Sequence, residues 1–302
     1  MYWNSLNDRL REQYGTKVYK LALSSGCSCP NRDGTLGGRG CIFCDGAGAF
    51  AAAGEVSRQL EEAKSRVAAK VREDAKYIAY FQSFTNTYGS AERLRELYRA
   101  AIEPEEIVAL SIATRPDCLP PEILELLSEL NQVKPVWVEL GLQTIHPATA
   151  HYIRRGYELP VYEAAVAALK ARGITVVTHQ ILGLPGETAD MMAETAQYIG
   201  QSGADGVKFH LLHVLRGTDL AADFEAGKVE PLTLEGYISV LEECVRRIPR
   251  DMVIHRLTGD GAKRDLLAPL WSGDKKRVLN AIRAAFLRDD VEQGSALNPQ
   301  KK

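Results

Sequence analysis

The chain alternates between short apolar runs and longer segments with the polar and apolar spacing of amphipathic helices. Six apolar runs predict β-strands, at residues 17–23, 76–84, 105–114, 135–144, 174–184 and 205–212. Helices are predicted between them, at residues 55–74, 90–101, 120–130, 147–172 and 187–202. Because strand and helix alternate regularly, and the strands are apolar along nearly their whole length, we expect a parallel sheet that is covered on both faces.

Six strand–helix units are fewer than the eight of a closed α/β barrel. The predicted fold is therefore α/β, with a partial TIM-like (β/α)6 barrel over residues 1–230. A C-terminal α/β extension at residues 231–288 is expected to pack on this barrel, with helices at 231–248, around 262–270 and at 274–288 and a short strand at 253–257. The polar residues 289–302 predict a disordered tail.

The composition suits a sizeable globular core and gives little information on binding partners. The chain has 302 residues, 45% hydrophobic content and a formal net charge of −2, which neither favours nor excludes a nucleic-acid partner. Its first residues lack the pattern of a signal peptide, and no apolar run approaches the roughly 20 residues that span a bilayer. We therefore expect a cytoplasmic protein without a membrane segment, in which thiols stay reduced. No pattern in the sequence predicts the oligomeric state.

The loop after the first predicted strand, residues 27–46, contains four of the six cysteines: Cys27, Cys29, Cys41 and Cys44. It is otherwise rich in Gly, Pro, Asn and Asp, so we expect thiolate ligation of a metal, rather than a hydrophobic core, to hold it together. Disulfides suit small secreted domains and fit this chain poorly. A structural zinc takes four ligands, commonly as two close pairs, and an iron–sulfur cluster held by three cysteines would leave one iron open. The spacing alone supports zinc and iron–sulfur about equally.

Polar side chains stand at the end of every predicted strand, which is where sites form in parallel barrels. Taken singly, each has a structural explanation, such as a helix cap or a packed histidine. Together they predict a large cofactor pocket, because six consecutive strand ends carry them. The set comprises Gln82, Thr85, Asn86, Ser111, Thr114, Arg115, Asp117, Glu139, Gln143, His179, Gln180, Lys208, His210 and His213.

The run CPNRDG…GCIFC resembles the cluster loop of the radical S-adenosylmethionine (radical SAM) superfamily. It is most similar to a small bacterial branch, the YhcC/YtqA type, which is related to the catalytic subunit of Elongator and has the same long interval after its first cysteine. The resemblance implies a radical SAM partial barrel in which Cys29, Cys41 and Cys44 hold a [4Fe-4S] cluster. Phe43 stands at the usual aromatic position before the last ligand, whereas Cys27 lies outside the pattern.

The segments TNTY, ATRPD, ELGLQT and HQILGLPGE carry the resemblance further along the chain. They imply S-adenosylmethionine-binding positions at Phe43, Gln82, Thr85, Asn86, Ser111, Thr114, Arg115, Glu139, Gln143, His179 and Leu182. The Gly-Gly-Glu triplet that is common after the second strand is absent here. The implied reaction is reductive cleavage of S-adenosylmethionine to a 5′-deoxyadenosyl radical, with the electron supplied by a donor such as flavodoxin or ferredoxin.

The extension has an uneven charge: residues 246–283 contain ten Lys or Arg and four Asp or Glu, an excess of six positive charges. This is typical of a phosphate-backbone partner, and a scattered, solvated set of charges is an equally supported alternative. The Elongator resemblance implies a tRNA wobble-uridine substrate, whose carboxymethylaminomethyl side chain would become aminomethyl. Substrate-side candidates are Lys208, His210, His213, His255 and Arg256. The alternatives are a radical SAM enzyme acting on a peptide or small metabolite, and a non-catalytic zinc or iron–sulfur protein.

Overall fold

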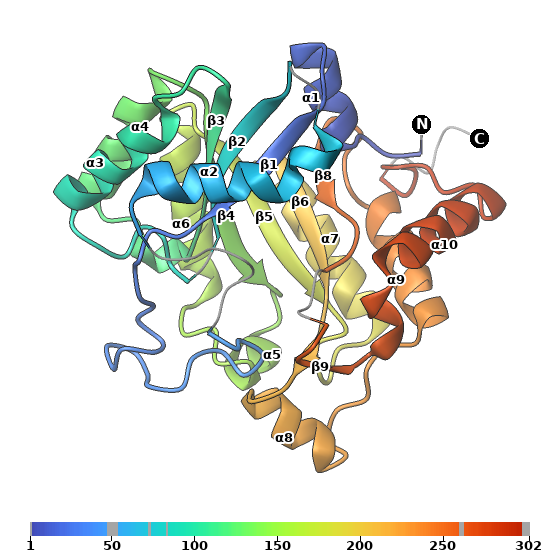
Figure 1. The fold of residues 1–302 in the computed structure, drawn as a ribbon. Coiled ribbons are helices and arrows are strands. Elements are labelled where there is room, and N and C mark those ends of the chain that lie inside the picture. Colours follow the sequence, from blue (N-terminus) through green and yellow to red (C-terminus); the bar gives the residue numbers. More distant parts are fainter. Residues whose placement is uncertain (1, 47–53, 72–73, 83, 260–262, 298–302) are drawn as a thin grey trace.

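Seven parallel strands form one sheet that curls into a half-barrel (Figure 1). The computed structural model describes residues 2–46, 54–71, 74–82, 84–259 and 263–297. Strand order in the sheet is β1-β2-β3-β4-β5-β6-β8, so neighbours in the sheet follow one another in the chain. The strands are β1 (Val18–Leu23), β2 (Lys76–Phe81), β3 (Ile107–Thr114), β4 (Val136–Gln143), β5 (Thr175–Leu182), β6 (Gly206–Leu211) and β8 (Val253–Arg256).

Helices pack along the outside of this curved sheet. The main hydrophobic core lies between the strands and the buried faces of these helices, with Tyr98, Tyr162 and Tyr237 among its largest side chains. Ser90, Thr188 and similar caps begin several helices by accepting a hydrogen bond from a first-turn N–H. The helices are α1 (Leu6–Tyr14), α2 (Val56–Val67), α3 (Ala91–Ile102), α4 (Pro121–Asn131), α5 (Pro147–Tyr152), α6 (Leu159–Lys170), α7 (Ala189–Gln201), α8 (Asp219–Glu225), α9 (Leu234–Arg246) and α10 (Lys275–Arg288). None of those in the described ranges is both long and apolar enough to cross a bilayer.

The predicted fold class is confirmed, and the extension contributes more to the barrel than the sequence indicated. Its short strand, β8, pairs in parallel with β6 and becomes the seventh strand of the main sheet. The prediction of a helix around 262–270 is wrong for residues 263–270, the part of that segment that the structure describes. The chain there forms β9 (Leu266–Ala268), which pairs antiparallel with β7 (Val214–Leu215), before a short 3-10 helix at Leu270–Gly273. Pro269 explains the difference, because proline inside a helix removes a hydrogen bond and clashes with the preceding turn.

The predicted disordered tail is also wrong for residues 289–297, and residues 298–302 lie outside the described part of the chain. Val291 is 1% exposed and belongs to the main core. The Gln293 side chain donates to the carbonyl groups of Pro249 and Met252 and accepts from the backbone N–H of Asn4. A polar residue is therefore buried here because its amide is fully hydrogen-bonded.

The packed tail gives a stability prediction. Val291→Ala should lower the free energy of unfolding by about 2 kcal/mol, because it removes two buried methyl groups. Leu287→Ala is the matched control, since Leu287 is 66% exposed, and it should change stability little. Urea unfolding followed by circular dichroism measures both variants. Equal stability of Val291→Ala and the parent protein would show that this segment does not pack as described.

Candidate active site

The cysteine loop follows β1 and lies at the carboxyl ends of the strands, where it faces the inside of the half-barrel. Cys29, Cys41 and Cys44 line one cavity of about 320 Å³ together with side chains from β2, β3, β4, β5 and β6. The loop is anchored at Ile42, which is buried in a small core with Ile153 and Leu220. Its N–H donates to the carbonyl of Ile153, and its own carbonyl accepts from the N–H of Leu220.

The donor set of this loop fits an iron–sulfur cluster better than a single metal ion. Among the described residues, no three His, Cys, Asp or Glu side chains converge closely enough to hold one ion. In a cluster each thiolate binds its own iron, so its ligands can stand further apart. Burial, followed by the charge of Cys44, raises the pKa of Cys41 to about 11. Thiolates at this position therefore depend on a metal, or on nearby cations, to form.

Arg32 supplies such a cation from within the loop, although the sequence analysis did not select it. Its guanidinium donates to the Cys44 carbonyl and lines the same cavity as the three thiols. Burial opposes its charge, but the Cys44 bond and the charges of the three cysteines outweigh burial and raise the pKa of Arg32. A Cβ at Gly40 or Gly46 would lie 2.8 or 2.9 Å from this guanidinium, and both glycines have positive φ. The loop is thus wrapped around one arginine.

The end of β4 bears a feature typical of a ligand-binding wall. The register between β4 and β5 shifts between Gly141 and Gln143, and Gln143 has a φ of 69°. Such a bulge turns a side chain away from the regular strand direction. Gln143 lines the cavity, and within the described ranges its buried Oε1 has no hydrogen-bond partner. A buried acceptor without a partner is costly in the free protein, so this atom is suited to receive a donor from a bound cofactor.

Glu139, in the middle of β4, joins side chains from four other strands and is fully buried. Lys20 of β1 donates to its Oε1 over 2.9 Å, and Lys208 of β6 donates to its Oε2. Ser111 of β3 and His179 of β5 bond the same carboxylate at 2.7 and 2.8 Å. Burial would raise the pKa of Glu139, but the two lysines and His179 hold it well below its ordinary value. Glu139 is therefore an anion that holds the concave face of the sheet together.

The histidines on this face are neutral. Burial lowers the pKa of His179 to about 4, although its bond to Glu139 opposes the shift. The pKa values of His210 and His255 are likewise well below their ordinary range because both rings are buried. His179 and His210 lie with ring centroids 4.9 Å apart. Burial also lowers the pKa of Lys208, with Glu139 opposing that shift.

Most of the predicted site residues line three neighbouring cavities that share part of their walls. The main cavity includes Phe43, Gln82, Thr85, Thr114, Arg115, Glu139, Gln143, His179, His210 and Arg256 besides the three cysteines. A neighbouring cavity of about 320 Å³ shares Tyr80, Gln82 and Arg256 with it and adds Lys20, Lys208 and His255. A third, of about 240 Å³, adds His213.

Three predicted cofactor contacts, Asn86, Ser111 and Leu182, do not appear in the described lining of these cavities. The Asn86 amide donates to the Ala113 carbonyl, and its oxygen accepts from Ser25. Ser111 is engaged by Glu139, and Leu182 is fully buried in the main core. The structure thus gives these three residues supporting contacts behind the cavity wall.

Arg115 is placed on the cavity wall but is already engaged. Its Nε and Nη2 donate to the Asp117 carboxylate at 2.9 and 2.7 Å, and its Nη1 donates to the Arg155 carbonyl. Binding of S-adenosylmethionine by Arg115 stays a prediction. Lys20, Arg155 and Tyr157 are further wall or network residues that the sequence analysis missed.

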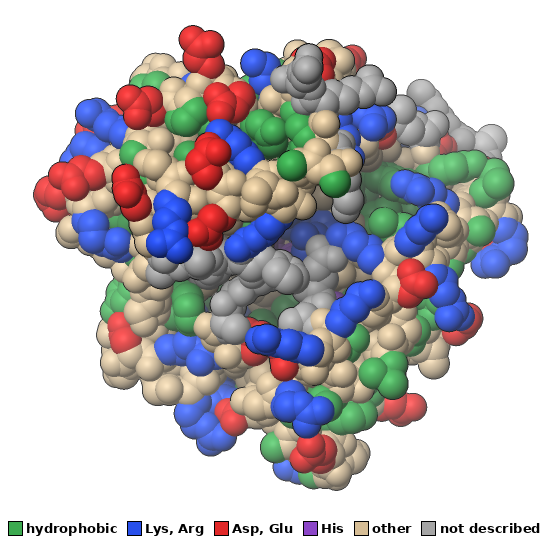
Figure 2. Space-filling view, in the orientation of Figure 1, with side chains coloured by type: hydrophobic (Ala, Val, Ile, Leu, Met, Phe, Trp, Pro, Cys, Tyr) green, Lys and Arg blue, Asp and Glu red, His purple; other side chains and the backbone are tan. Residues whose placement is uncertain are grey.

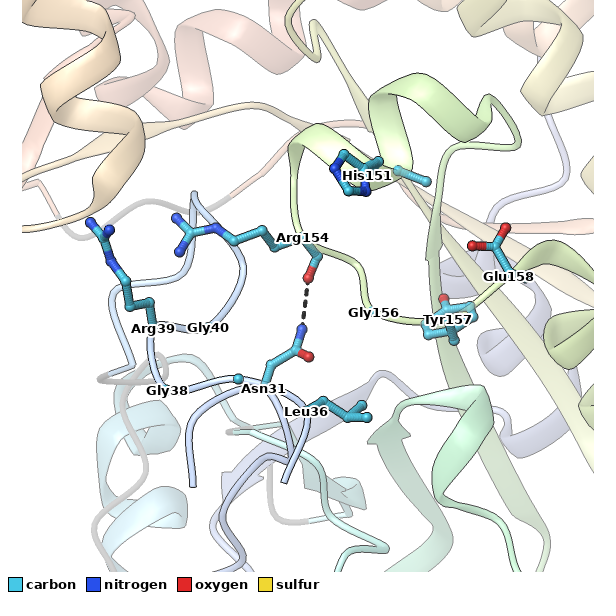
Figure 3. Close-up of a pocket in the computed structure, with 12 residues that line it drawn as sticks. Asn31, Leu36, Gly38, Arg39, Gly40, His151, Arg154, Gly156, Tyr157 and Glu158 are labelled. Carbon is cyan, nitrogen blue, oxygen red and sulfur yellow. Dashed lines mark hydrogen bonds between the residues drawn. The ribbon is translucent and has the colours of Figure 1, made fainter. Parts of the chain in front are cut away.

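A larger cavity, of about 570 Å³, lies on the other side of the cysteine loop, against α5 and the segment after it (Figure 3). Its lining contains no thiol among the described residues. Asn31 crosses between the two segments and donates to the Arg154 carbonyl, as Figure 3 shows. Arg39 and Arg154, both on this side, are paired with Asp219 at the start of α8. These contacts hold the loop in place, so we assign the chemistry to the thiol-lined cavity and a supporting role to this one.

Comparison with known proteins agrees with this geometry. The radical SAM superfamily profile matches residues 29–199, more than half of the chain, and the profile of the radical SAM C-terminal domain matches residues 204–288. The chain belongs to the radical SAM superfamily. Members of this superfamily bind a [4Fe-4S] cluster and S-adenosylmethionine, and the three thiols and the cavity beside them provide for both.

Individual relatives place the chain in a narrower branch. The Bacillus subtilis protein YtqA is 44% identical over 296 residues, which cover 97% of this chain and 92% of YtqA. The Escherichia coli protein YhcC is 38% identical over 295 residues, covering 97% of this chain and 95% of YhcC. The solved Elp3 of Methanocaldococcus infernus shares the fold with a TM-score of 0.70 at 18% identity, over 91% of this chain and 64% of that one. This radical SAM protein is thus of the YhcC/YtqA type, related to Elongator.

The position of Arg32 predicts an effect on the cluster that can be measured without turnover. Arg32→Leu should lower the iron content after reconstitution and make the cluster midpoint potential more negative, on the order of 50–100 mV, because a nearby positive charge is lost. Arg39→Leu is the control, because it removes the same charge from the lining of the outer cavity. Iron analysis and a spectroscopic redox titration give the two values. Identical potentials for the Arg32→Leu and parent proteins would refute this electrostatic role.

The buried histidines predict a loss of stability in mild acid. Their pKa values are depressed in the folded protein, so the stability present above the unfolded value of about 6.5 is lost as pH falls below it. Each such histidine should lose about 1.3 kcal/mol of unfolding free energy between pH 7 and pH 5.5. His210→Gln should make this decline shallower by that amount, and the exposed control His151→Gln should not. Urea unfolding at the two pH values measures this loss of unfolding free energy. A loss in His210→Gln as large as in the parent protein would contradict the prediction.

Proposed function

We propose that this radical SAM enzyme acts on tRNA and converts a carboxymethylaminomethyl side chain on the wobble uridine to an aminomethyl one. The observation that carries the substrate is a relative: a Methanocaldococcus jannaschii protein named tRNA uridine(34) acetyltransferase is 32% identical over 176 residues. The match covers 54% of this chain and 32% of that protein, so it supports a related substrate and not the same overall reaction.

The distribution of charge on the surface supports a nucleic-acid partner. Figure 2 shows Lys and Arg side chains around a hollow near the centre of one face. The C-terminal extension adds further exposed cations, among them Lys263, Lys276, Arg277 and Arg283. Because phosphate contacts supply much of the affinity for RNA and position the strand, such cations can bring a tRNA loop to the mouth of a buried site.

The residues of the chain would perform the binding and positioning parts of this reaction. When bound, the cluster and S-adenosylmethionine would supply the two-electron oxidation of the carbon between the substrate nitrogen and its carboxylate, with S-adenosylmethionine reduced to methionine and 5′-deoxyadenosine. Hydrolysis of the resulting imine would leave the aminomethyl group on the uridine and release the other two carbons as glyoxylate. Cys29, Cys41 and Cys44 would hold the cluster, and Gln143 offers a buried acceptor to the cofactor. The buried wall around Glu139 keeps water from the reacting carbon. The electron would come from a donor of the flavodoxin or ferredoxin type.

Mass spectrometry of tRNA nucleosides tests the proposal. Purified, anaerobically reconstituted protein is incubated with S-adenosylmethionine, dithionite and tRNA from a strain that lacks the gene. The expected result is loss of 5-carboxymethylaminomethyluridine, gain of 5-aminomethyluridine and formation of 5′-deoxyadenosine. Formation of 5′-deoxyadenosine with an unchanged tRNA profile, both in vitro and in the deletion strain, would refute the substrate.

Two cysteine variants serve as matched controls for this reaction. Cys44→Ser should lose iron and all product, because Cys44 is one of the three thiols on the cavity wall. Cys27→Ser should keep its iron and its activity, because Cys27 is buried away from that lining and its Sγ lies 2.9 Å from an Arg93 nitrogen. Equal iron loss in both variants would show that the assignment of the three ligands is incorrect.

A further inference from the structure

The two cavities that meet at the Glu139 network contain more positive than negative side chains. Glu139 is the one carboxylate in their described lining, which also includes Lys20 and Lys208. Near the cysteine loop, thiolates and Asp117 offset the arginines. At the Glu139 end, two ammonium groups share one carboxylate, and all three groups are wholly or largely buried. A buried charge without a full counter-charge is unfavourable, so this end of the cavity is suited to a further anion.

The neighbourhood of the lysines supplies the other components of a binding site. Lys20 and Lys208 lie over the ring of Tyr80, 4.8 and 4.4 Å from its centroid. Buried ring nitrogens of His210 and His255, Nε2 and Nδ1 respectively, have no hydrogen-bond partner among the residues that the structure describes. The side chain of Lys20 is 23% exposed and stands on β1, the edge strand of the open sheet. The cations therefore lie next to empty space that can be reached from the sheet edge.

We propose that Lys20 and Lys208 bind a carboxylate group of the substrate beside Glu139, in the middle of the half-barrel. The proposal rests on the proposed function for the identity of the molecule, a uridine whose side chain ends in a carboxymethyl group. It adds the residues that recognise this end and assigns Lys20 as a specificity-determining residue. The carboxylate would then lie in a cavity that shares Tyr80, Gln82 and Arg256 with the cavity of the three thiols, which brings the adjacent carbon toward the position that hydrogen transfer requires.

The geometry favours a side-chain carboxylate over a phosphate of the RNA backbone. Glu139 itself shows that the two amines accommodate a carboxylate, since each of its oxygens receives one of them. The site is at mid-strand depth, in cavities of about 320 Å³ each, which a side chain can enter more easily than a polynucleotide strand. A nucleotide phosphate shares the same chemistry, and the experiment separates the two sources.

The test uses reconstituted protein with S-adenosylmethionine and no reductant, so that binding occurs without turnover. Calorimetry compares three probes: 5-carboxymethylaminomethyluridine, 5-aminomethyluridine and uridine 5′-monophosphate. The parent protein should bind the carboxylated nucleoside tenfold to a hundredfold more tightly than the aminomethyl one, about the range of a charge-assisted hydrogen bond. Equal affinity for these two nucleosides overturns the proposal. Tighter binding of the monophosphate that depends on Lys20 also overturns it, because the cations would then serve a phosphate.

Variants with opposite expected signs exclude a merely structural effect. Lys20→Gln should abolish the preference for the carboxylated probe, and Lys20→Arg should restore part of it. Lys17→Gln removes the same charge from an exposed position directly before β1 and should leave the preference intact. Glu139→Gln removes the competing carboxylate and should tighten binding of the same probe. If Lys20→Gln retains the preference, or both Lys20→Gln and Glu139→Gln weaken binding alike, the assignment is refuted.

A second pair of probes separates failure of this inference from failure of the proposed function. N-methylglycine and dimethylamine serve as a second probe pair that differ by a carboxylate and contain no nucleoside. A Lys20-dependent preference for N-methylglycine with an unmodified tRNA profile supports the carboxylate site and refutes the tRNA substrate alone. Modified tRNA without any carboxylate preference supports the function and refutes this inference.

Discussion

A single buried carboxylate organises the concave face of this half-barrel. A closed barrel fills its interior with interdigitating apolar side chains, whereas a sheet that ends at β1 and β8 leaves that face open. Here Glu139 receives hydrogen bonds from β1, β3, β5 and β6, so five strands meet at one charged group. Such a network is stable only while all of its members are present, because removal of one partner leaves a buried charge uncompensated.

The cysteine loop likewise depends on a few specific contacts. It has little apolar content, and its fold is maintained by Ile42 in a small core, by Asn31 against the segment after α5, and by Arg32 at its centre. Glycine is favoured at positions 40 and 46 because both have a positive φ, and a side chain there would also displace the Arg32 guanidinium. The protein thus prepares a positively charged, preformed loop for thiolates that would otherwise stay protonated.

The fold was largely predictable because the strands are continuous apolar runs and the helices between them are amphipathic. The strands of the barrel follow this pattern closely. The helix predicted around residues 262–270 was wrong because Pro269 lies within that segment. The candidate site was less predictable. Lys20 is a single charged residue in an otherwise ordinary strand. Arg32 stands in a loop that is already polar, so its charge does not mark it as a site residue. Asn86 follows β2 as predicted, whereas Ser111 lies within β3, and neighbouring groups take up the hydrogen bonds of both, which only three-dimensional contacts reveal.

The seam where the two ends of the chain meet has a consequence for biosynthesis. Ser5 pairs with Ile254 of β8, and the Asn4 amide donates to the carbonyl of Asp251, a separation of 247 residues. Helix α1 can therefore dock only after nearly the whole polypeptide has left the ribosome. Until then the end of the barrel at the start of β1, where Leu10 of α1 packs against Val18 and Trp137, stays uncovered.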